Sequence, residues 1–313
     1  MAKPEPNVSQ AIVTAAAEVA ASVSAQVLFA YANAIDDLVI LRRTLRAPTK
    51  PILICRDGAE EERVREAKLT PMRVPSFDLT RMGQIKMATL LAFSQSLLNT
   101  GDVFVFLSGV AGHDVDTMVV MRVGEEYELF LSVGQPKLTE HIRRPVFEKV
   151  LRLALELAHE GREGKPVGTL FVVGDHRNVE KYCLPGRINP FKGYTEKERN
   201  ILDETLDESV KEIAQLDGAF VIKGNGVIVA GCVTLRPTIA GAQLAQGLGA
   251  RHAAAAGITA ATQSIAMSLS ESTGDVRVWR RGNMITEIEK SPRSLLDGTV
   301  PPGVKSPGHA NGQ

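Results

Sequence analysis

Residues 27–55, VLFAYANAIDDLVILRRTLRAPTKPILIC, decide the fold class of this chain. Two apolar runs, Val27–Tyr31 and Ile52–Cys55, have the length and composition of buried strands. The stretch between them, roughly Ile35–Leu45, predicts a helix. A strand, a helix and a second strand in this order are typical of an α/β layer architecture with a parallel sheet.

The same alternation extends on both sides of this unit. Further helices are expected over Ser9–Ser24, Ala59–Ala67 and Thr80–Leu98, and further strands over Val103–Leu107, Met118–Val123 and Glu128–Val133. The last two strands are predicted to form a hairpin that turns at Gly124-Glu125-Glu126. This hairpin would place an antiparallel edge on the sheet. Gly134-Gln135-Pro136 is a natural break. Residues 1–135 are therefore predicted to form an α/β domain with a mostly parallel sheet.

The second half predicts an α+β domain with a mixed central sheet over residues 136–290. Its expected helices are Leu138–Glu160 and one opened by the capping box Thr195–Glu198, which would carry Leu202, Leu206, Val210 and Ile213 on one face. Its expected strands are Thr169–Val173, Gly218–Ile222, Val227–Val233, Ser264–Leu269, Val276–Arg280 and Met284–Ile288, with a loop over Gly174–Tyr194. Residues 291–313, rich in Pro, Gly and Ser, are expected to be a disordered tail.

Composition excludes several classes of protein. The 313 residues include 36 Lys+Arg and 36 Asp+Glu, and this balance argues against a general nucleic-acid binder. No run of eighteen apolar residues and no signal peptide is visible, so we expect no membrane association. Cys55, Cys183 and Cys232 are too far apart for a disulfide framework or a CxxC metal site. The chain is expected to be soluble and cytoplasmic.

Three short segments of the second half carry the candidate chemistry. In Leu216–Phe220, Asp217 could hold a metal ion or accept a proton, and the small Gly218 and Ala219 would let a ligand approach closely. A plain turn at the start of a strand accounts for the same segment. In Leu269–Gly274, Ser270 could donate to a phosphate and Glu271 could bind a metal, or the segment is simply a polar hairpin turn.

The third segment, Gly247-Leu248-Gly249-Ala250-Arg251-His252, places glycines before a helix former. A helix N-terminus offers unpaired backbone amides and a positive dipole end to phosphate. Arg251 adds a guanidinium fork suited to phosphate oxygens, and His252 could add a donor. The alternative is a glycine loop before a buried helix.

Taken in order, these segments resemble the diadenylate cyclase (DAC) domain family. That family has a DGA motif, then usually GTRHR, then usually SEE-T-G, and Ile188-Asn189-Pro190-Phe191 also resembles a segment of its members. The likeness covers roughly residues 138–289 and best fits the archaeal-type branch. There, an α/β domain resembling the C-terminal domain of pyruvate kinase precedes the cyclase; this part of the likeness rests on element order alone.

The resemblance implies roles for individual residues. Asp217 matches the catalytic and metal-binding Asp, and Glu271 matches an acidic residue at the metal site. Arg251 and His252 match the catalytic basic pair at the triphosphate. The implied nucleotide contacts are Gly218, Ala219, Gly249, Ala250, Ser270 and Glu271.

The chain departs from the family pattern at three positions. Ala250 replaces the usual Thr, Ala253 replaces the last Arg of RHR, and Ser272 replaces the second Glu of SEE. Loss of the Arg removes a charge-assisted contact worth about 1.5–3 kcal/mol. If the second Glu is the true metal ligand, Glu271 is the wrong assignment.

The implied activity is condensation of two ATP into cyclic di-AMP and two pyrophosphates, with Mn or Mg. Because the product is nearly two-fold symmetric, we expect a homo-oligomer with catalytic domains face to face. One alternative is a binding protein for ATP or the cyclic dinucleotide that has lost turnover, which Ala253 favours. Another is an oligomeric scaffold whose N-terminal domain carries the function, by assembling or sensing a ligand.

Overall fold

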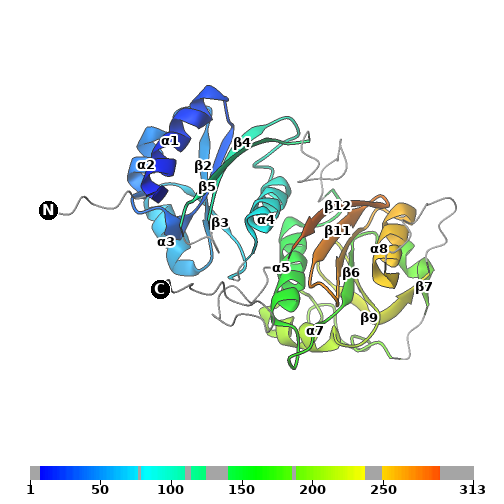
Figure 1. Cartoon of the computed structure of the whole chain (residues 1–313). Coiled ribbons are helices and arrows are strands. Elements are labelled where there is room, and N and C mark those ends of the chain that lie inside the picture. Colours follow the sequence, from blue (N-terminus) through cyan, green and yellow to red (C-terminus); the bar gives the residue numbers. More distant parts are fainter. Residues whose placement is uncertain are drawn as a thin grey trace, which may run out of the picture.

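The computed structural model describes residues 8–76, 79–109, 114–124, 140–184, 188–236 and 249–289. Within them the chain forms a five-stranded sheet followed by a seven-stranded sheet, each covered by helices (Figure 1). The predicted α/β class, with a mostly parallel sheet before a mixed one, is confirmed. The expected strand Glu128–Val133, the break at Gly134–Pro136 and the tail at 291–313 lie outside the described residues.

The first sheet has the strand order β3-β2-β1-β4-β5. Its described strands are β1 (Val27–Tyr31), β2 (Lys50–Cys55), β3 (Thr70–Arg73), β4 (Val103–Ser108) and β5 (Thr117–Arg122). Strands β1 to β4 pair in parallel, and β5 pairs antiparallel with β4. The antiparallel edge predicted from Met118–Val123 is therefore confirmed. This strand forms a hairpin with β4, and its predicted partner Glu128–Val133 lies outside the described residues.

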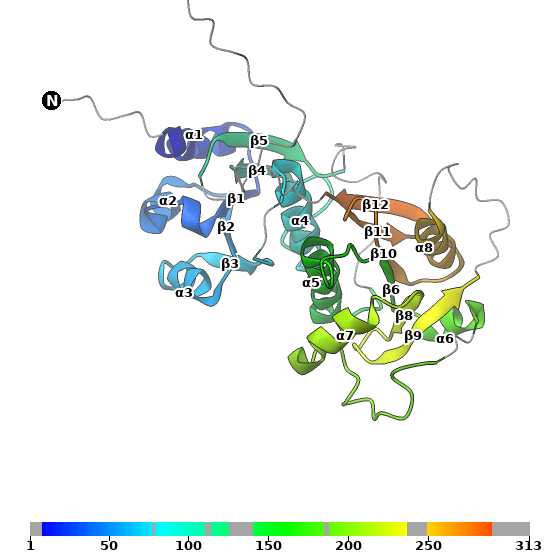
Figure 2. The same cartoon turned by 60° about the horizontal axis from the view of Figure 1, so that its bottom comes forward.

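Helices cover both faces of this sheet (Figure 2). The described helices are α1 (Val8–Ser22), α2 (Leu38–Thr44), α3 (Gly58–Glu66) and α4 (Arg81–Ser94), with a short 3-10 turn at Ala32–Ala34. Leu28 and Ala30 of β1 pack with residues of α1, α2 and α3, whereas Phe29 packs on the opposite face with Ile85 of α4. Burial on both faces explains why β1 is a continuous apolar run.

The second sheet has the order β12-β11-β10-β6-β8-β9-β7. Its described strands are β6 (Thr169–Val173), β7 (Cys183–Leu184), β8 (Ala219–Ile222), β9 (Ile228–Leu235), β10 (Ile265–Leu269), β11 (Val276–Arg280) and β12 (Asn283–Ile288). Only β6 and β8 pair in parallel among these strands. The sheet is therefore mixed.

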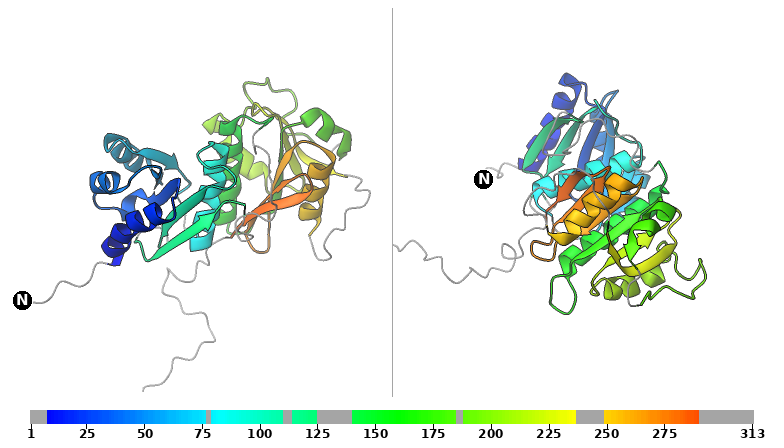
Figure 3. Two further views of the ribbon diagram at one scale, coloured as in Figure 1. Left: turned by 90° about the horizontal axis from the view of Figure 1, so that it is seen from above. Right: turned by 90° about the vertical axis from the view of Figure 1, so that its right-hand side faces the viewer.

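Two layers of helix enclose the second sheet. Helix α8 (Ala250–Ala261) covers one face, where Ala255 and Ile258 join the core formed by Leu170 and Val221 (Figure 3, right). Helices α5 (Arg144–Glu160) and α7 (Asp207–Ile213) lie on the other face. There the rings of Phe171 and Phe220 stack with centroids 4.9 Å apart.

Helix α4 joins the two units by packing against α5 and β12 (Figure 3, left). Apolar residues of both units belong to one continuous core cluster. Polar contacts reinforce this junction: Nζ of Lys86 lies 3.1 Å from a carboxylate oxygen of Glu289, and the amide of Gln95 donates to Glu148 at 3.0 Å. The two sheets are therefore mechanically connected.

Two predicted helices begin later than expected. Helix α5 begins at Arg144, because Pro145 lacks an amide hydrogen and fits only the first turn. In the capping box, the Thr195 amide does donate to Glu198 at 2.8 Å, but only a turn follows. Asn200 forms a bridge with Val227 that interrupts a helix there. Helix α7 therefore begins at Asp207, beyond Leu202 and Leu206, after a 3-10 turn at Glu204–Leu206.

Four further short elements were not predicted. Strand β3 has four residues, includes Pro71 and buries only Met72 fully, so it lacks an apolar run. The expected loop Gly174–Tyr194 contains helix α6 (His176–Val179), a 3-10 turn at Glu180–Tyr182 and strand β7. No helix of the described part combines the length and apolar character needed to cross a bilayer.

Candidate active site

The three candidate segments meet at one end of the second sheet. In the strand register, Leu170 lies beside Ala219 and Thr169 lies beside Leu269. The start of β8 and the end of β10 therefore flank the start of β6. Helix α8 begins at the same end, which brings Asp217, Arg251 and Glu271 together.

Arg251 links the two candidate carboxylates. Its Nη2 lies 3.4 Å from Oδ1 of Asp217, and its Nη1 donates to Oε2 of Glu271 at 3.1 Å. The side chains of Asp217 and Glu271 are 93% and 60% exposed, whereas Arg251 is half-buried. An exposed ion pair of this kind contributes at most about 1 kcal/mol, so the guanidinium can exchange a carboxylate for phosphate. The structure thus brings together three of the predicted residues.

Gly168 completes this cluster and was not predicted. A Cβ at Gly168 would lie 2.4 Å from Nη1 of Arg251 and 2.9 Å from Cβ of Glu271. The arginine therefore occupies space that any larger residue at 168 would take. In the sequence, Gly168 is marked only as a glycine directly before a strand, a pattern that is also common where no ligand binds.

The small residues after Asp217 serve packing in this structure. Gly218 has φ +127°, and a Cβ there would lie 2.5 Å from the carbonyl carbon of Cys232 on β9. Ala219 is buried in the core beneath α8. We predicted both as nucleotide contacts; in this structure Gly218 packs against the backbone of β9 and Ala219 is buried, so the contact stays a prediction.

Gly249 caps the exposed N-terminus of α8, with Ala250 as the first helical residue. A Cβ at Gly249 would have no described heavy atom within 4 Å. The first amides of a helix have no partner within it. Among the described residues, this end of α8 has space beside Gly249, and its role in binding phosphate stays a prediction; Gly247 and Leu248 lie outside the described residues.

His252 faces the core. Its Nδ1 lies 2.9 Å from Oγ of Ser268, which also accepts a hydrogen bond from Nε1 of Trp279 at 2.8 Å. The imidazole stacks on the Trp279 ring with centroids 6.2 Å apart. Burial, together with the charges of Arg277 and Arg251, lowers the pKa of His252 to about 4. We predicted a basic donor to the triphosphate; in this structure the imidazole is buried against Ser268, and desolvation opposes its protonation.

Ser270 begins the turn between β10 and β11. It is buried, its Oγ lies 3.2 Å from Oγ of Ser272, and it accepts the Thr273 amide at 3.3 Å. The backbone amide of Ser270 donates to Asp275 at 3.0 Å. The hairpin-turn interpretation is confirmed, and this turn is also what presents Glu271 to Arg251.

The donor set fits a divalent metal that arrives with a nucleotide. Asp217 and Glu271 offer hard carboxylate oxygens, which Mg²⁺ and Mn²⁺ prefer, and Mg²⁺ is usually held by one or two carboxylates together with phosphates. Both carboxylates contact the same guanidinium. Within the described ranges there is no group of three His, Cys, Asp or Glu that could hold a metal without such help.

Other polar residues lie away from this cluster. His113 is outside the described residues, and Asp116 pairs with Arg81. Asp175 accepts the Gln263 amide at 2.9 Å, at the end of β6 opposite Asp217. Arg280 at the end of β11 is buried, and burial lowers its pKa.

Comparison with known proteins places this site in a nucleotide-binding domain. Residues 156–284 match the family model described as DAC, DisA bacterial checkpoint controller nucleotide-binding. Residues 9–131 match the model described as probable sensor domain DacZ_P. The first range contains Asp217, Arg251 and Glu271.

Full-length relatives define the family. A diadenylate cyclase of Haloferax volcanii is 38% identical over 203 residues, which are 63% of this chain and 72% of the relative. A diadenylate cyclase of Methanocaldococcus jannaschii is 37% identical over 189 residues, 58% of this chain and 57% of that relative. The chain belongs to the diadenylate cyclase family, and it is an enzyme of this kind.

Solved structures resemble parts of the chain more distantly. DacA from Staphylococcus aureus is 21% identical with a TM-score of 0.29, over 44% of this chain and 83% of that one. A pyruvate kinase from Cryptosporidium parvum is 22% identical with a TM-score of 0.30, over 38% of this chain and 23% of that one. Because both TM-scores are low, the fold class stands on the sheet topology described above.

Proposed function

We propose that this chain condenses two ATP into cyclic di-AMP and two pyrophosphates at the cluster of Asp217, Arg251 and Glu271. The observation that carries the proposal is Arg251 in the first turn of α8, between two carboxylates and inside the matched range. A cation, free helix amides and carboxylates are the groups that a metal-bearing triphosphate requires.

In the proposed reaction, the 3′-oxygen of each ATP attacks the α-phosphorus of the other. The bond from that phosphorus to the oxygen bridging the β-phosphate breaks, and pyrophosphate leaves with the electron pair. Asp217 orients the 3′-hydroxyl and accepts its proton or passes it to solvent. Two such events close the ring, so atoms and charge balance.

Arg251 and the first amides of α8 bind the triphosphate and neutralise charge on the leaving pyrophosphate. Ser270 offers a hydroxyl at the same edge. Asp217 and Glu271 would hold a divalent Mn or Mg ion, which supplies charge neutralisation on the phosphate oxygens. His252 acts as a positioning residue: held by Ser268 and stacked on Trp279, it fixes the first turn of α8 and so the base of Arg251.

The active unit is proposed to be two chains facing each other. Asp217 is 93% exposed in a single chain, so one protomer leaves this carboxylate open to a second ATP. The near two-fold symmetry of the product requires a C₂ arrangement of the two sites. Because ATP is the substrate, we place this reaction in the cytoplasm, free of membrane and nucleic acid.

We assign residues 136–290 to catalysis and residues 1–135 to assembly or regulation. The match of residues 9–131 to a probable sensor domain supports the regulatory role. Deleting residues 1–135 is expected to alter assembly or regulation, and unchanged behaviour would contradict this role.

A second candidate is a cyclase-like binding protein without turnover. Ala250 and Ala253, where the family has Thr and Arg, favour it because two phosphate-binding groups are missing. The test is incubation with ATP and either Mn²⁺ or Mg²⁺, with product detected by mass spectrometry. Cyclic di-AMP that disappears in Asp217→Asn supports the cyclase; ATP binding with no product under either metal supports the binding protein.

A further inference from the structure

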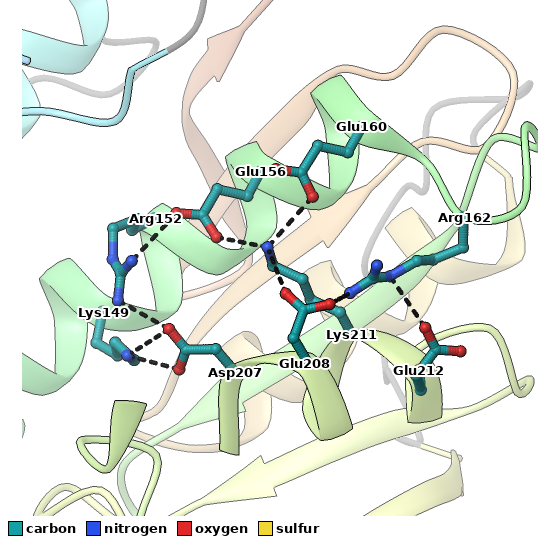
Figure 4. A network of polar contacts seen from close by, with 9 residues as sticks. All are labelled: Lys149, Arg152, Glu156, Glu160, Arg162, Asp207, Glu208, Lys211 and Glu212. Atoms are coloured by element: carbon teal, nitrogen blue, oxygen red, sulfur yellow. Dashed lines mark hydrogen bonds and ion pairs between the residues drawn. The ribbon is translucent and has the colours of Figure 1, made fainter. Parts of the chain in front are cut away.

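A network of charged side chains joins α5 to α7 on the face of the second sheet opposite α8 (Figure 4). Its members are Lys149, Arg152, Glu156, Glu160, Arg162, Asp207, Glu208, Lys211 and Glu212. The first four belong to α5, the last four belong to α7, and Arg162 lies in the loop that follows α5. The network therefore connects two helices that the proposed catalytic cluster does not include.

The ion pairs show that α5 and α7 run side by side in the same direction. Near the start of each helix, Nζ of Lys149 lies 2.6 Å from Oδ1 of Asp207. Further along both helices, Nζ of Lys211 lies 2.9 Å from Oε2 of Glu156 and 3.2 Å from Oε2 of Glu160 (Figure 4). Both helices therefore end at the same end of the sheet.

The segments that follow these helices both lead to the proposed catalytic cluster. After α5 the chain enters β6 through Gly168, where a Cβ would lie 2.4 Å from Nη1 of Arg251. After α7 the Leu216 amide donates to the Ile213 carbonyl at 3.0 Å, and Asp217 follows directly. The position of α7 against α5 therefore contributes to the distance between Asp217 and Arg251.

Lys211 is the buried cation of this network that lies nearest to Asp217 in the chain. Its side chain is 6% exposed, and its Nζ also lies 3.4 Å from Oε1 of Glu208 in the same helix. Burial opposes the charge of Lys211, but Glu156 and Glu160 outweigh burial and raise the pKa of the lysine. Lys211 is therefore a cation held between two helices.

A buried ion pair fixes geometry more than it stabilises a fold. The cost of desolvating the charges offsets much of their attraction, so the net stabilisation is small. Val210 and Ala214 are fully buried and already hold α7 on the core by apolar contacts, which have no preferred direction. A hydrogen-bonded ion pair is directional, so Lys211 can fix the register of α7 against α5.

We propose that Lys211 is a positioning residue: it fixes α7 against α5 and so holds the turn of residues 214–216 that places Asp217 beside the 3′-hydroxyl. Its role in turnover rests on the proposed cyclase function, whereas its hold on the turn does not. Loss of the Lys211 charge shifts Asp217 but leaves Arg251, which lies on α8, in place. The effect is therefore on the chemical step and not on ATP binding.

Turnover kinetics test the role in the reaction. Lys211→Met keeps the apolar stem and removes the charge; it is expected to lower kcat at least tenfold and to leave the KM for ATP within twofold of wild type. Lys149→Met is the matched control, because it removes a cation of the same network that is 7% exposed and pairs with the first residue of α7. The kcat of this control is expected to stay within twofold of wild type.

A conservative variant separates positioning from bulk stability. Lys211→Arg keeps the charge and is expected to recover at least half of the wild-type kcat. An equal loss of kcat in Lys211→Met and Lys149→Met overturns the proposal, since both remove a buried cation from the same pair of helices. A loss confined to the KM for ATP overturns it as well.

Hydrogen exchange measures the turn directly and needs no turnover. The amides of residues 214–216 donate to carbonyls of α7 at 2.9, 3.2 and 3.0 Å. They are expected to exchange at least tenfold faster in Lys211→Met and at wild-type rates in Lys149→Met. Wild-type exchange of these amides in the folded Lys211→Met variant overturns the proposal.

A milder variant keeps the test decisive if Lys211→Met does not fold. Glu160→Gln removes one α5 partner of Lys211, and its side chain is 49% exposed, so the fold should tolerate the change. It is expected to lower kcat and to speed exchange of residues 214–216 at least threefold each. Wild-type values for both measurements in Glu160→Gln contradict the proposal.

The two measurements also separate this proposal from the proposed function. Faster exchange of residues 214–216 in Lys211→Met, with no cyclic di-AMP from wild type, would leave the hold on the turn standing and remove the cyclase function. Cyclic di-AMP from wild type, with exchange and kcat unchanged in Lys211→Met, would do the reverse.

Discussion

Nη2 of Arg251 lies 3.4 Å from Oδ1 of Asp217, a contact between residues 34 positions apart in the chain. In the proposed reaction these two groups have separate partners, a triphosphate and a 3′-hydroxyl. Because the contact is solvent-exposed, it is weak and readily exchanged. The ion pair therefore holds the two side chains close together, and it dissociates when a polyanion binds Arg251.

Asp217→Asn is expected to lower cyclic di-AMP formation by about 10³-fold or more, because it removes the proton acceptor and metal ligand. Its free energy of unfolding should stay within about 0.5 kcal/mol of wild type, since the side chain is exposed. Product yield by mass spectrometry and urea unfolding measure the two effects. Glu18→Gln, an exposed change on α1, serves as control, and residual activity near wild type in Asp217→Asn would contradict the assignment.

Gly168→Ala is expected to raise the KM for ATP about tenfold, because the new methyl group would displace the Arg251 guanidinium. The methyl group would also lie 2.9 Å from Cβ of Glu271, so the turn that carries Glu271 must shift and the melting temperature should fall. Gly58→Ala is the matched control, since its nearest neighbour is 3.9 Å away. Wild-type kinetics in Gly168→Ala would show that the observed position of Arg251 is irrelevant to ATP binding.

His252 is expected to make stability depend on pH in the acidic range. Its pKa falls from 6.5 to about 4 on folding, chiefly through burial. Between these pH values the unfolded chain binds a proton that the folded chain does not. The contribution of the neutral His252 to the free energy of unfolding is therefore fully present above pH 6.5 and is lost as the pH falls toward 4. At pH 5 the loss is about 2 kcal/mol. Urea unfolding of wild type and His252→Gln at pH 7 and pH 5 measures it; identical pH dependence in both would disprove a buried neutral imidazole.

Gly218→Ala is expected to destabilise the fold by at least about 2 kcal/mol. The position combines φ +127° with a backbone approach to Cys232 that a methyl group would enter at 2.5 Å. Unlike Gly168, the obstacle here is backbone, which cannot swing aside. Thermal and urea unfolding test this prediction, and a melting temperature equal to that of wild type would contradict the packing role of this glycine.

The sequence predicted strands best where both faces are buried. Val27–Tyr31 and Thr169–Val173 were predicted with the bounds that the structure has, because a doubly buried strand is a nearly continuous apolar run. Val276–Arg280 was also predicted with its bounds, although two arginines interrupt its apolar residues. Strand β3 gave no such signal. The Thr195–Glu198 box formed its local bonds without a helix, because the pairing of distant residues overrides local capping.

The candidate site was predictable in its charged residues but not in its packing. The order of motifs brought Asp217, Arg251 and Glu271 together, and the fold confirms their proximity. The burial of His252 was not predicted, because the sequence does not reveal which side of α8 is buried. Gly168 was missed because its importance depends on a side chain 83 positions away that only the tertiary structure places beside it.

The central claim is that two ATP-bearing chains meet face to face at Asp217, and subunit mixing tests it most directly. Wild type and Asp217→Asn are diluted until protomers separate, combined at varying ratios with constant total protein, and reconcentrated; recovery of a tagged subunit with its untagged partner confirms exchange. If both Asp217 side chains of a pair are required, the rate of cyclic di-AMP formation will follow the square of the wild-type fraction. A rate strictly proportional to that fraction, with exchange confirmed, would contradict the face-to-face site.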